Sequence, residues 1–141
     1  MKKTLILAFA ILLIAGLAFG EEEKADTDNT IKVYSDFAEA KETGKTVLCF
    51  FYTQKSCACT NKKCKSAMDL MHGIRKGLPE DIAYCELETA DHADLVKEYR
   101  LVSPPVVLIF NQEGKQVSRL DSWKIKKQNI EAELEKLDKD N

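Results

Sequence analysis

The chain has 141 residues, of which 45% are hydrophobic and 31% are charged, and its formal net charge is −2. This length fits one domain, and the composition excludes collagen, a polar disordered chain and a protein with several membrane spans. Domains that bind nucleic acids are usually basic, so the weak negative charge argues against a nucleic-acid partner. The five cysteines are the unusual feature of the composition.

The first 20 residues have the layout of a secretory signal peptide. Lys2-Lys3 precedes an apolar run over residues 5–19, and Ala18-Phe19-Gly20 provides small residues for signal cleavage. The run is short for a membrane-spanning helix, which needs about 20 apolar residues. We therefore expect cleavage after residue 20, no membrane span in the mature chain, and a periplasmic or extracellular location, where disulfides persist. An uncleaved anchor is the alternative.

Residues 21–30 form a strongly acidic segment with a single hydrophobic residue, Ala25. Such a segment cannot bury enough apolar surface to offset the entropy lost on ordering. We predict a disordered spacer here and assign residues 31–141 to one folded domain.

Helix and strand patterns alternate along this domain. Ser35 and Gly44 bound a first predicted helix, and a longer helix follows a cysteine-bearing turn at residues 53–61. Apolar runs predict buried strands at 47–52, 82–87 and 106–110. A short helix at 91–99, a hairpin into an edge strand at 117–120 and a closing amphipathic helix that carries Ile125, Ile130, Leu134 and Leu137 complete the order. This order predicts an α/β fold with a central mixed sheet flanked by helices.

The elements and their joints resemble the thioredoxin family over about residues 33–138. An apolar strand ending in Phe51-Tyr52-Thr53 runs into a cysteine pair that opens a helix. The segment from Tyr99 to Phe110 is similar to the family's tyrosine-to-cis-proline segment and the strand after it, and the hairpin at Gly114 also matches. The resemblance implies that Pro105 is a cis proline facing the active site, with Ser103 and Pro104 on the same edge of a substrate groove.

The chain departs from the family at the cysteine pair. Here the pair is Cys57-Ala58-Cys59, whereas the family carries Cys-x-x-Cys. An ungapped alignment places Ser56 at the family's nucleophile position and Cys59 at the resolving position, and a one-residue insertion restores Cys57 as the nucleophile. The family's buried acid, which assists proton transfer to the resolving thiol, falls at Phe50.

Three cysteines, Cys57, Cys59 and Cys64, lie at the start of the predicted helix. A helix N-terminus stabilises negative charge, and four lysines surround the cysteines: Lys55, Lys62, Lys63 and Lys65. Both effects lower the pKa of a thiol, and the thiolate is the reactive form. We therefore expect a lowered pKa for at least one of Cys57 and Cys59.

Three functions remain open for these cysteines. In the first, Cys57 attacks and Cys59 resolves disulfides of extracytoplasmic partner proteins, with Cys64 as a second resolving thiol and no cofactor beyond the redox-active disulfide. In the second, Cys57, Cys59 and Cys64 bind Cu(I) or Zn(II), although no fourth ligand is evident. In the third, the cysteines staple the loop of a non-catalytic binding module. We expect a monomer.

The remaining cysteines and the single tryptophan are expected to have structural roles. Cys49 and Cys85 belong to apolar strand patterns that the thioredoxin order makes neighbours, so we expect two buried thiols, with a cross-strand disulfide as the alternative. Trp123 precedes the last helix and is expected to pack in the core.

Overall fold

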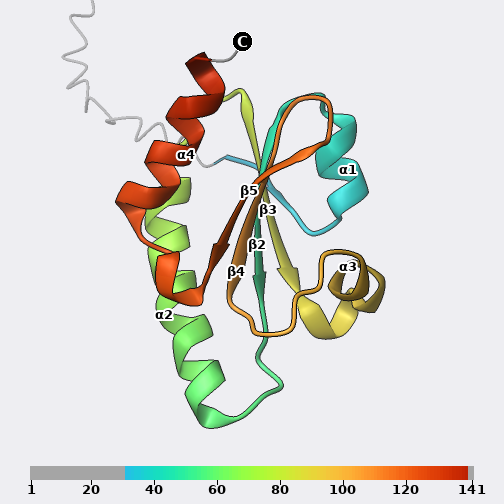
Figure 1. Cartoon of the computed structure of the whole chain (residues 1–141), viewed down its shortest axis with the longest axis vertical. Coiled ribbons are helices and arrows are strands. Elements are labelled where there is room, and N and C mark those ends of the chain that lie inside the picture. Colours follow the sequence, from blue (N-terminus) through green and yellow to red (C-terminus); the bar gives the residue numbers. More distant parts are fainter. Residues whose placement is uncertain (1–30, 140–141) are drawn as a thin grey trace, which may run out of the picture.

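The computed structural model describes residues 31–139 (Figure 1). The predicted signal peptide and acidic spacer lie outside the described residues, so they remain predictions. Within residues 31–139, no helix is long and apolar enough to cross a membrane.

In the described part of the chain, five strands form one mixed sheet in the order β1-β3-β2-β4-β5. They are β1 (Val33–Tyr34), β2 (Thr46–Tyr52), β3 (Ile82–Glu88), β4 (Val106–Phe110) and β5 (Gln116–Asp121). The pairs β1–β3 and β2–β3 are parallel, whereas β4 runs antiparallel to both β2 and β5. The predicted α/β class and mixed sheet are confirmed.

Helices cover both faces of this sheet. Within residues 31–139 there are four α-helices, α1 (Phe37–Glu42), α2 (Ala58–Arg75), α3 (Ala93–Glu98) and α4 (Lys127–Lys139), and two short 3₁₀ turns, η1 (Thr89–Asp91) and η2 (Ser122–Lys124). In Figure 1, α2 and α4 lie together on one face, and α1 and α3 lie on the other.

Alternate side chains of β2 enter two separate core clusters, as strand geometry requires. Leu48 and Phe50 pack with residues of α2 and α4 that include Met71, Ile74 and Ile130. The alternate residues of β2 face the other cluster, which is built around α1: Val47, Cys49 and Phe51. The central strands are thus covered on both faces, which explains their continuous apolar sequence.

Three details of the sequence prediction need correction. The first helix is capped by Asp36 rather than Ser35, because the Asp36 carboxylate accepts the backbone N–H of Glu39 at 3.0 Å. The two-residue strand β1 was not predicted. The last helix begins at Lys127, so the buried Ile125 precedes it.

Candidate functional site

The cysteine pair lies where β2 leads into α2. Cys57 is the N-cap residue of α2, and Cys59 lies in the first turn of that helix. Both cysteines are exposed. The structure therefore places Cys57, and not Ser56, at the start of the helix.

The two exposed thiols contact each other. The Sγ atoms of Cys57 and Cys59 are 2.8 Å apart, whereas a disulfide bond is about 2.05 Å long. The hydroxyl of Thr60 lies 3.2 Å from the Cys57 Sγ, because the side chain three residues after an N-cap points back toward it. Three polar groups therefore meet on the open face of the first helical turn.

These contacts lower the pKa of the Cys57 thiol to about 6. The largest cause is the hydrogen bond from Cys59, and the Thr60 hydroxyl is the second. The backbone N–H groups of Thr60 and Cys59 add to the effect from the helix end, although neither closes a formal capping hydrogen bond to the sulfur. A lowered pKa was expected, but its cause is hydrogen bonding to Cys57 and not the charge of the nearby lysines.

Replacing Thr60 by valine should raise the pKa of Cys57 toward its ordinary value. The hydroxyl contact disappears while the shape of the side chain is kept, so the thiolate fraction near pH 6 falls. We expect the pH midpoint of iodoacetamide alkylation at Cys57, followed by mass spectrometry, to move upward. Thr60→Ser is the matched control, since it retains the hydroxyl and should keep the wild-type midpoint. Equal midpoints in all three proteins would contradict the role of Thr60.

The turn before Cys57 has a partner for each of four successive backbone N–H groups. That of Thr53 donates to the Cys64 Sγ at 3.5 Å, and that of Gln54 donates to the Glu88 carboxylate at 3.3 Å. The N–H of Lys55 donates to the Thr53 hydroxyl, and that of Ser56 donates to the Asn61 amide oxygen. The backbone N–H groups of the turn are therefore satisfied within the chain itself.

Asn61 and Glu88 were missed from the sequence. The Asn61 side chain forms a reciprocal pair with the Ser56 backbone, accepting its N–H at 3.2 Å and donating to its carbonyl at 3.1 Å. An asparagine in the first turn of a helix is a recognisable signal, because its short amide competes for nearby backbone groups. Glu88 offered no comparable signal, since it reaches the turn from another strand.

Cys64 is separated from the exposed pair. Its residue is only 2% exposed, and burial raises the pKa of its thiol. In residues 31–139 no group of three or more Cys, His, Asp or Glu side chains is arranged to hold a metal. The geometry thus does not bring Cys57, Cys59 and Cys64 together as ligands, and it gives Cys64 the role of an acceptor beneath the turn.

Pro105 lies at the same end of the sheet as the cysteine turn. The peptide bond between Pro104 and Pro105 is cis, as the resemblance implied. Val106 pairs with Phe51 near the end of β2, so the loop before β4 and the loop after β2 leave the sheet side by side, as Figure 1 shows. Pro105 is buried, Pro104 is half-buried and Ser103 is exposed.

Arg119 of β5 holds the segment that leads to this proline loop. Its guanidinium donates to the carbonyl of Tyr99 at 2.8 Å and to that of Arg100 at 3.3 Å, and its Nε donates to Asp121 at 2.9 Å. These carbonyls belong to the end of α3, where Arg100 takes a left-handed conformation with φ of 51°. Carbonyl groups at a helix end lack intrahelical hydrogen-bond donors, and here the Arg119 guanidinium provides two donors.

Arg119→Gln should loosen the proline loop without affecting the thiolate. We expect exchange with a peptide disulfide to slow about 5- to 10-fold through a higher KM, because the loop no longer holds its position. Alkylation of Cys57 by iodoacetamide should keep its wild-type rate, and hydrogen exchange at the Leu101 and Val102 amides should accelerate. Arg119→Lys keeps the charge but loses the fork, so an intermediate effect is expected. An equal loss in both reactions would contradict a positioning role.

Glu86 forms a polar contact network beside the Phe50 position. It pairs in register with Phe50, and its carboxylate lies 3.2 Å from the His72 Nε2 and accepts the Tyr84 hydroxyl at 3.0 Å. Burial is the main cause that raises the pKa of Tyr84, and the Glu86 carboxylate adds to it. A carboxylate therefore stands on the strand next to Phe50, and it engages His72 of α2.

The other two cysteines lie next to each other on neighbouring strands, on the same face of the sheet. Cys49 and Cys85 are register partners on β2 and β3, and both are fully buried free thiols. Burial raises the pKa of Cys49 well above its ordinary value. The prediction of two buried neighbouring thiols is confirmed.

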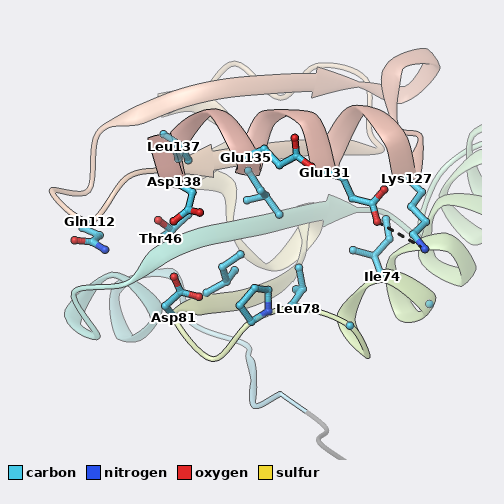
Figure 2. A pocket seen from close by; sticks show the side chains of 15 residues that line it. Thr46, Ile74, Leu78, Asp81, Gln112, Lys127, Glu131, Glu135, Leu137 and Asp138 are labelled. Atoms are coloured by element: carbon cyan, nitrogen blue, oxygen red, sulfur yellow. Dashed lines mark ion pairs between the residues drawn. The ribbon is translucent and has the colours of Figure 1, made fainter. Parts of the chain in front are cut away.

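Two cavities flank α2. One of about 560 Å³ lies between α2 and α4, at the end of the sheet where β2 begins, and Figure 2 shows its acidic rim, where Glu131 is ion-paired with Lys127 at 3.7 Å. A second, of about 400 Å³, lies beside the cysteine turn and is lined in part by Tyr52, Asn61 and Cys64. The larger cavity thus lies away from the exposed thiols.

Solved thioredoxin structures share this architecture. A thioredoxin from Trypanosoma brucei brucei matches with a TM-score of 0.61 at 12% identity, covering 82% of this chain and 96% of its own. A mutant thioredoxin from Halobacterium salinarum matches with a TM-score of 0.61 at 13% identity, covering 78% and 92%. A thioredoxin from Nicotiana alata matches with a TM-score of 0.59 at 18% identity, covering 76% and 91%.

No family model matches the sequence, and no curated protein matches it. The structural likeness covers most of the described residues at low identity, so it establishes the fold. The chain has the thioredoxin fold, as its element order and proline segment indicated.

Proposed function

We propose that this chain is an exported thiol–disulfide exchange protein that acts through Cys57 and Cys59. The observation that carries the proposal is the exposed Cys57 Sγ, which has a pKa of about 6 and lies 2.8 Å from a second thiol. Near neutral pH this thiol is largely ionised, and the thiolate is the nucleophile in disulfide exchange.

The exchange transfers two electrons in two steps. The Cys57 thiolate attacks one sulfur of a partner disulfide, forming a mixed disulfide and releasing the other partner sulfur as a thiolate that takes up a proton. Cys59 then loses its proton and attacks the Cys57 sulfur. The Cys57–Cys59 disulfide forms, the partner leaves as a dithiol, and the reverse sequence oxidises a partner dithiol.

The proline loop completes the proposed site. Pro105, with Ser103 and Pro104, would hold the backbone of a partner segment near the Cys57 sulfur. Cys64 stays outside the exchange in this proposal, because it is buried and accepts the Thr53 N–H. No metal or organic cofactor is required, since the electrons reside in the thiol pair.

The direction of exchange follows from the potential of the Cys57–Cys59 couple. Two cysteines separated by one residue close a small ring, and a strained disulfide is readily reduced. We therefore expect the oxidised form to donate its disulfide to partners or to shuffle theirs. Equilibration with glutathione buffers, with the species counted by mass spectrometry, measures this potential.

Mass spectrometry of the reduced protein mixed with a model peptide disulfide tests the function. We expect peptide thiol to be released as a mixed disulfide forms at Cys57, and we expect the oxidised protein, mixed with a peptide dithiol, to lose its Cys57–Cys59 disulfide as the peptide is oxidised. A protein that remains fully reduced, or one that forms a stable bridge to Cys64, would instead favour the binding-module alternative. Bound copper or zinc with reduced thiols, found by metal analysis of the purified protein, would favour the metal-binding alternative.

A further inference from the structure

We propose that a docking surface on the β5 side of the cysteine turn binds partner segments that are acidic and carry an apolar side chain. The docking surface consists of Val102, Trp123, Lys63, Lys124 and Lys126. The proposal rests on the exchange function above and specifies the class of partner that the site accepts.

Trp123 is exposed, although the sequence suggested a core position. It is 72% exposed in the η2 turn, and Ile125 fills the core instead. The Lys124 Nζ lies 4.7 Å from the centre of the Trp123 ring, and Trp123 remains exposed to solvent beside it. A large exposed aromatic side chain is a typical anchor for a partner.

Strand register places Trp123 beside the proline loop. Asp121 pairs with Val106, so the residues that follow Asp121 run alongside Pro105. Neighbouring strands lie about 4.8 Å apart and each residue advances about 3.3 Å, which brings the η2 turn close to the loop. Val102 on that loop is 86% exposed. Apolar side chains therefore flank the place where a partner backbone would lie.

Lysines give the docking surface a positive charge. Lys63 lies on the same stripe of α2 as Ile74, because the two positions are 11 residues, or about three turns, apart. Ile74 lines the cavity between α2 and α4, so this stripe faces α4. Lys126 is exposed and immediately precedes α4. Neither Lys63 nor Lys126 has an ion-pair partner among the described residues.

Acidic side chains gather on the opposite side of the cysteine turn. Glu88 ends β3 and accepts the Gln54 N–H, and Asp91 of η1 lies 4.0 Å from the Lys55 Nζ. Since β3 and β4 lie on opposite sides of β2, these acidic side chains and the lysines of the docking surface lie on opposite sides of the turn. The exposed lysines of the docking surface should attract an acidic segment, and Glu88 and Asp91 should repel it from the β3 side.

Fluorescence of Trp123, the only tryptophan in the chain, tests docking separately from exchange. The probes are three peptides with serine in place of a central cysteine, flanked by Glu and Leu, by Gln and Leu, or by Lys and Leu. We expect the acidic peptide to shift the emission with about tenfold higher affinity than the basic peptide at 20 mM salt, and most of the difference to vanish at about 500 mM.

Charge reversal provides the matched comparison. Lys63→Glu with Lys126→Glu should abolish or invert the preference, and a glutamate at the start of α4 suits the helix dipole. Lys76→Glu with Lys115→Glu changes the net charge equally at the far end of the sheet and should preserve the preference. Trp123→Ala should slow exchange with the Leu-containing acidic disulfide about fivefold, whereas Val117→Ala on the far part of β5 should not.

Several outcomes would overturn the docking surface. One is equal affinity for all three peptides, and another is the same change in peptide preference in both charge-reversal variants. A third is an equal emission shift with a single-stranded oligonucleotide, which would indicate unspecific anion binding. If the wild-type protein prefers the acidic peptide but exchanges no disulfide, the docking surface is supported and only the exchange function is ruled out.

Discussion

Cys57→Ser should lose disulfide exchange with a peptide substrate by at least about 10³-fold, since a serine hydroxyl remains protonated where the thiolate attacks. The residue is exposed at the helix end, so the fold should be unchanged. The rate of peptide-thiol release, measured with Cys57→Ser at matched folded concentration, checks this. A rate within tenfold of wild type would assign the attack to another thiol.

Cys59→Ser distinguishes attack from resolution. The variant retains the Cys57 nucleophile but lacks the thiol that closes the second step, so a mixed disulfide with the peptide should accumulate and be visible by mass spectrometry. Cys64→Ala is the control, because its thiol is buried under the turn, and it should resolve the mixed disulfide normally. If the mixed disulfide accumulated in Cys64→Ala but not in Cys59→Ser, Cys64 and not Cys59 would be the resolving thiol.

Phe50→Ala should destabilise the protein by about 3–5 kcal/mol, the usual cost of removing a large buried aromatic side chain. Phe50 is fully buried on a central strand, packs in the cluster that includes Met71, and stacks on Tyr52 with ring centroids 5.8 Å apart. Urea unfolding followed by circular dichroism measures the loss.

Phe50→Leu is the control for this change, and it should cost much less because it leaves a smaller cavity. The Cys57 alkylation rate in the folded fraction should be unchanged in both variants, since Phe50 stabilises the sheet and makes no hydrogen bond to the sulfur. A loss below about 1 kcal/mol for Phe50→Ala would show that the core closes over the missing ring.

The sequence predicted the central sheet because its strands are buried on both faces. Strands β2 and β4 are continuous apolar runs, and such runs stand out without any structural knowledge. Strand β1 has only two residues and forms through its pairing with β3, so no local pattern marked it. Trp123 was assigned to the core on residue type alone, but the packing of Ile125 and Ile130 fills that place.

For the candidate site, the sequence indicated which residues to consider but not the cause of the lowered pKa of Cys57. The spacing of Cys57 and Cys59 and the Pro104-Pro105 pair were visible in the sequence, whereas the start of α2 at Cys57 rather than at Ser56 was not. The lysines suggested a charge effect, yet the pKa of Cys57 depends on hydrogen bonds from Cys59 and Thr60. Such bonds depend on side-chain directions in the first helical turn, which composition and spacing do not report.

The burial of Cys49, Cys64 and Cys85 limits which thiols of the molecule can be oxidised. Of the five free cysteines only Cys57 and Cys59 are exposed in the folded protein, so an oxidant should remove one electron pair per folded molecule. An unfolded copy presents all five sulfurs at once. The number of thiols oxidised per molecule therefore reports the fraction of the protein that is folded.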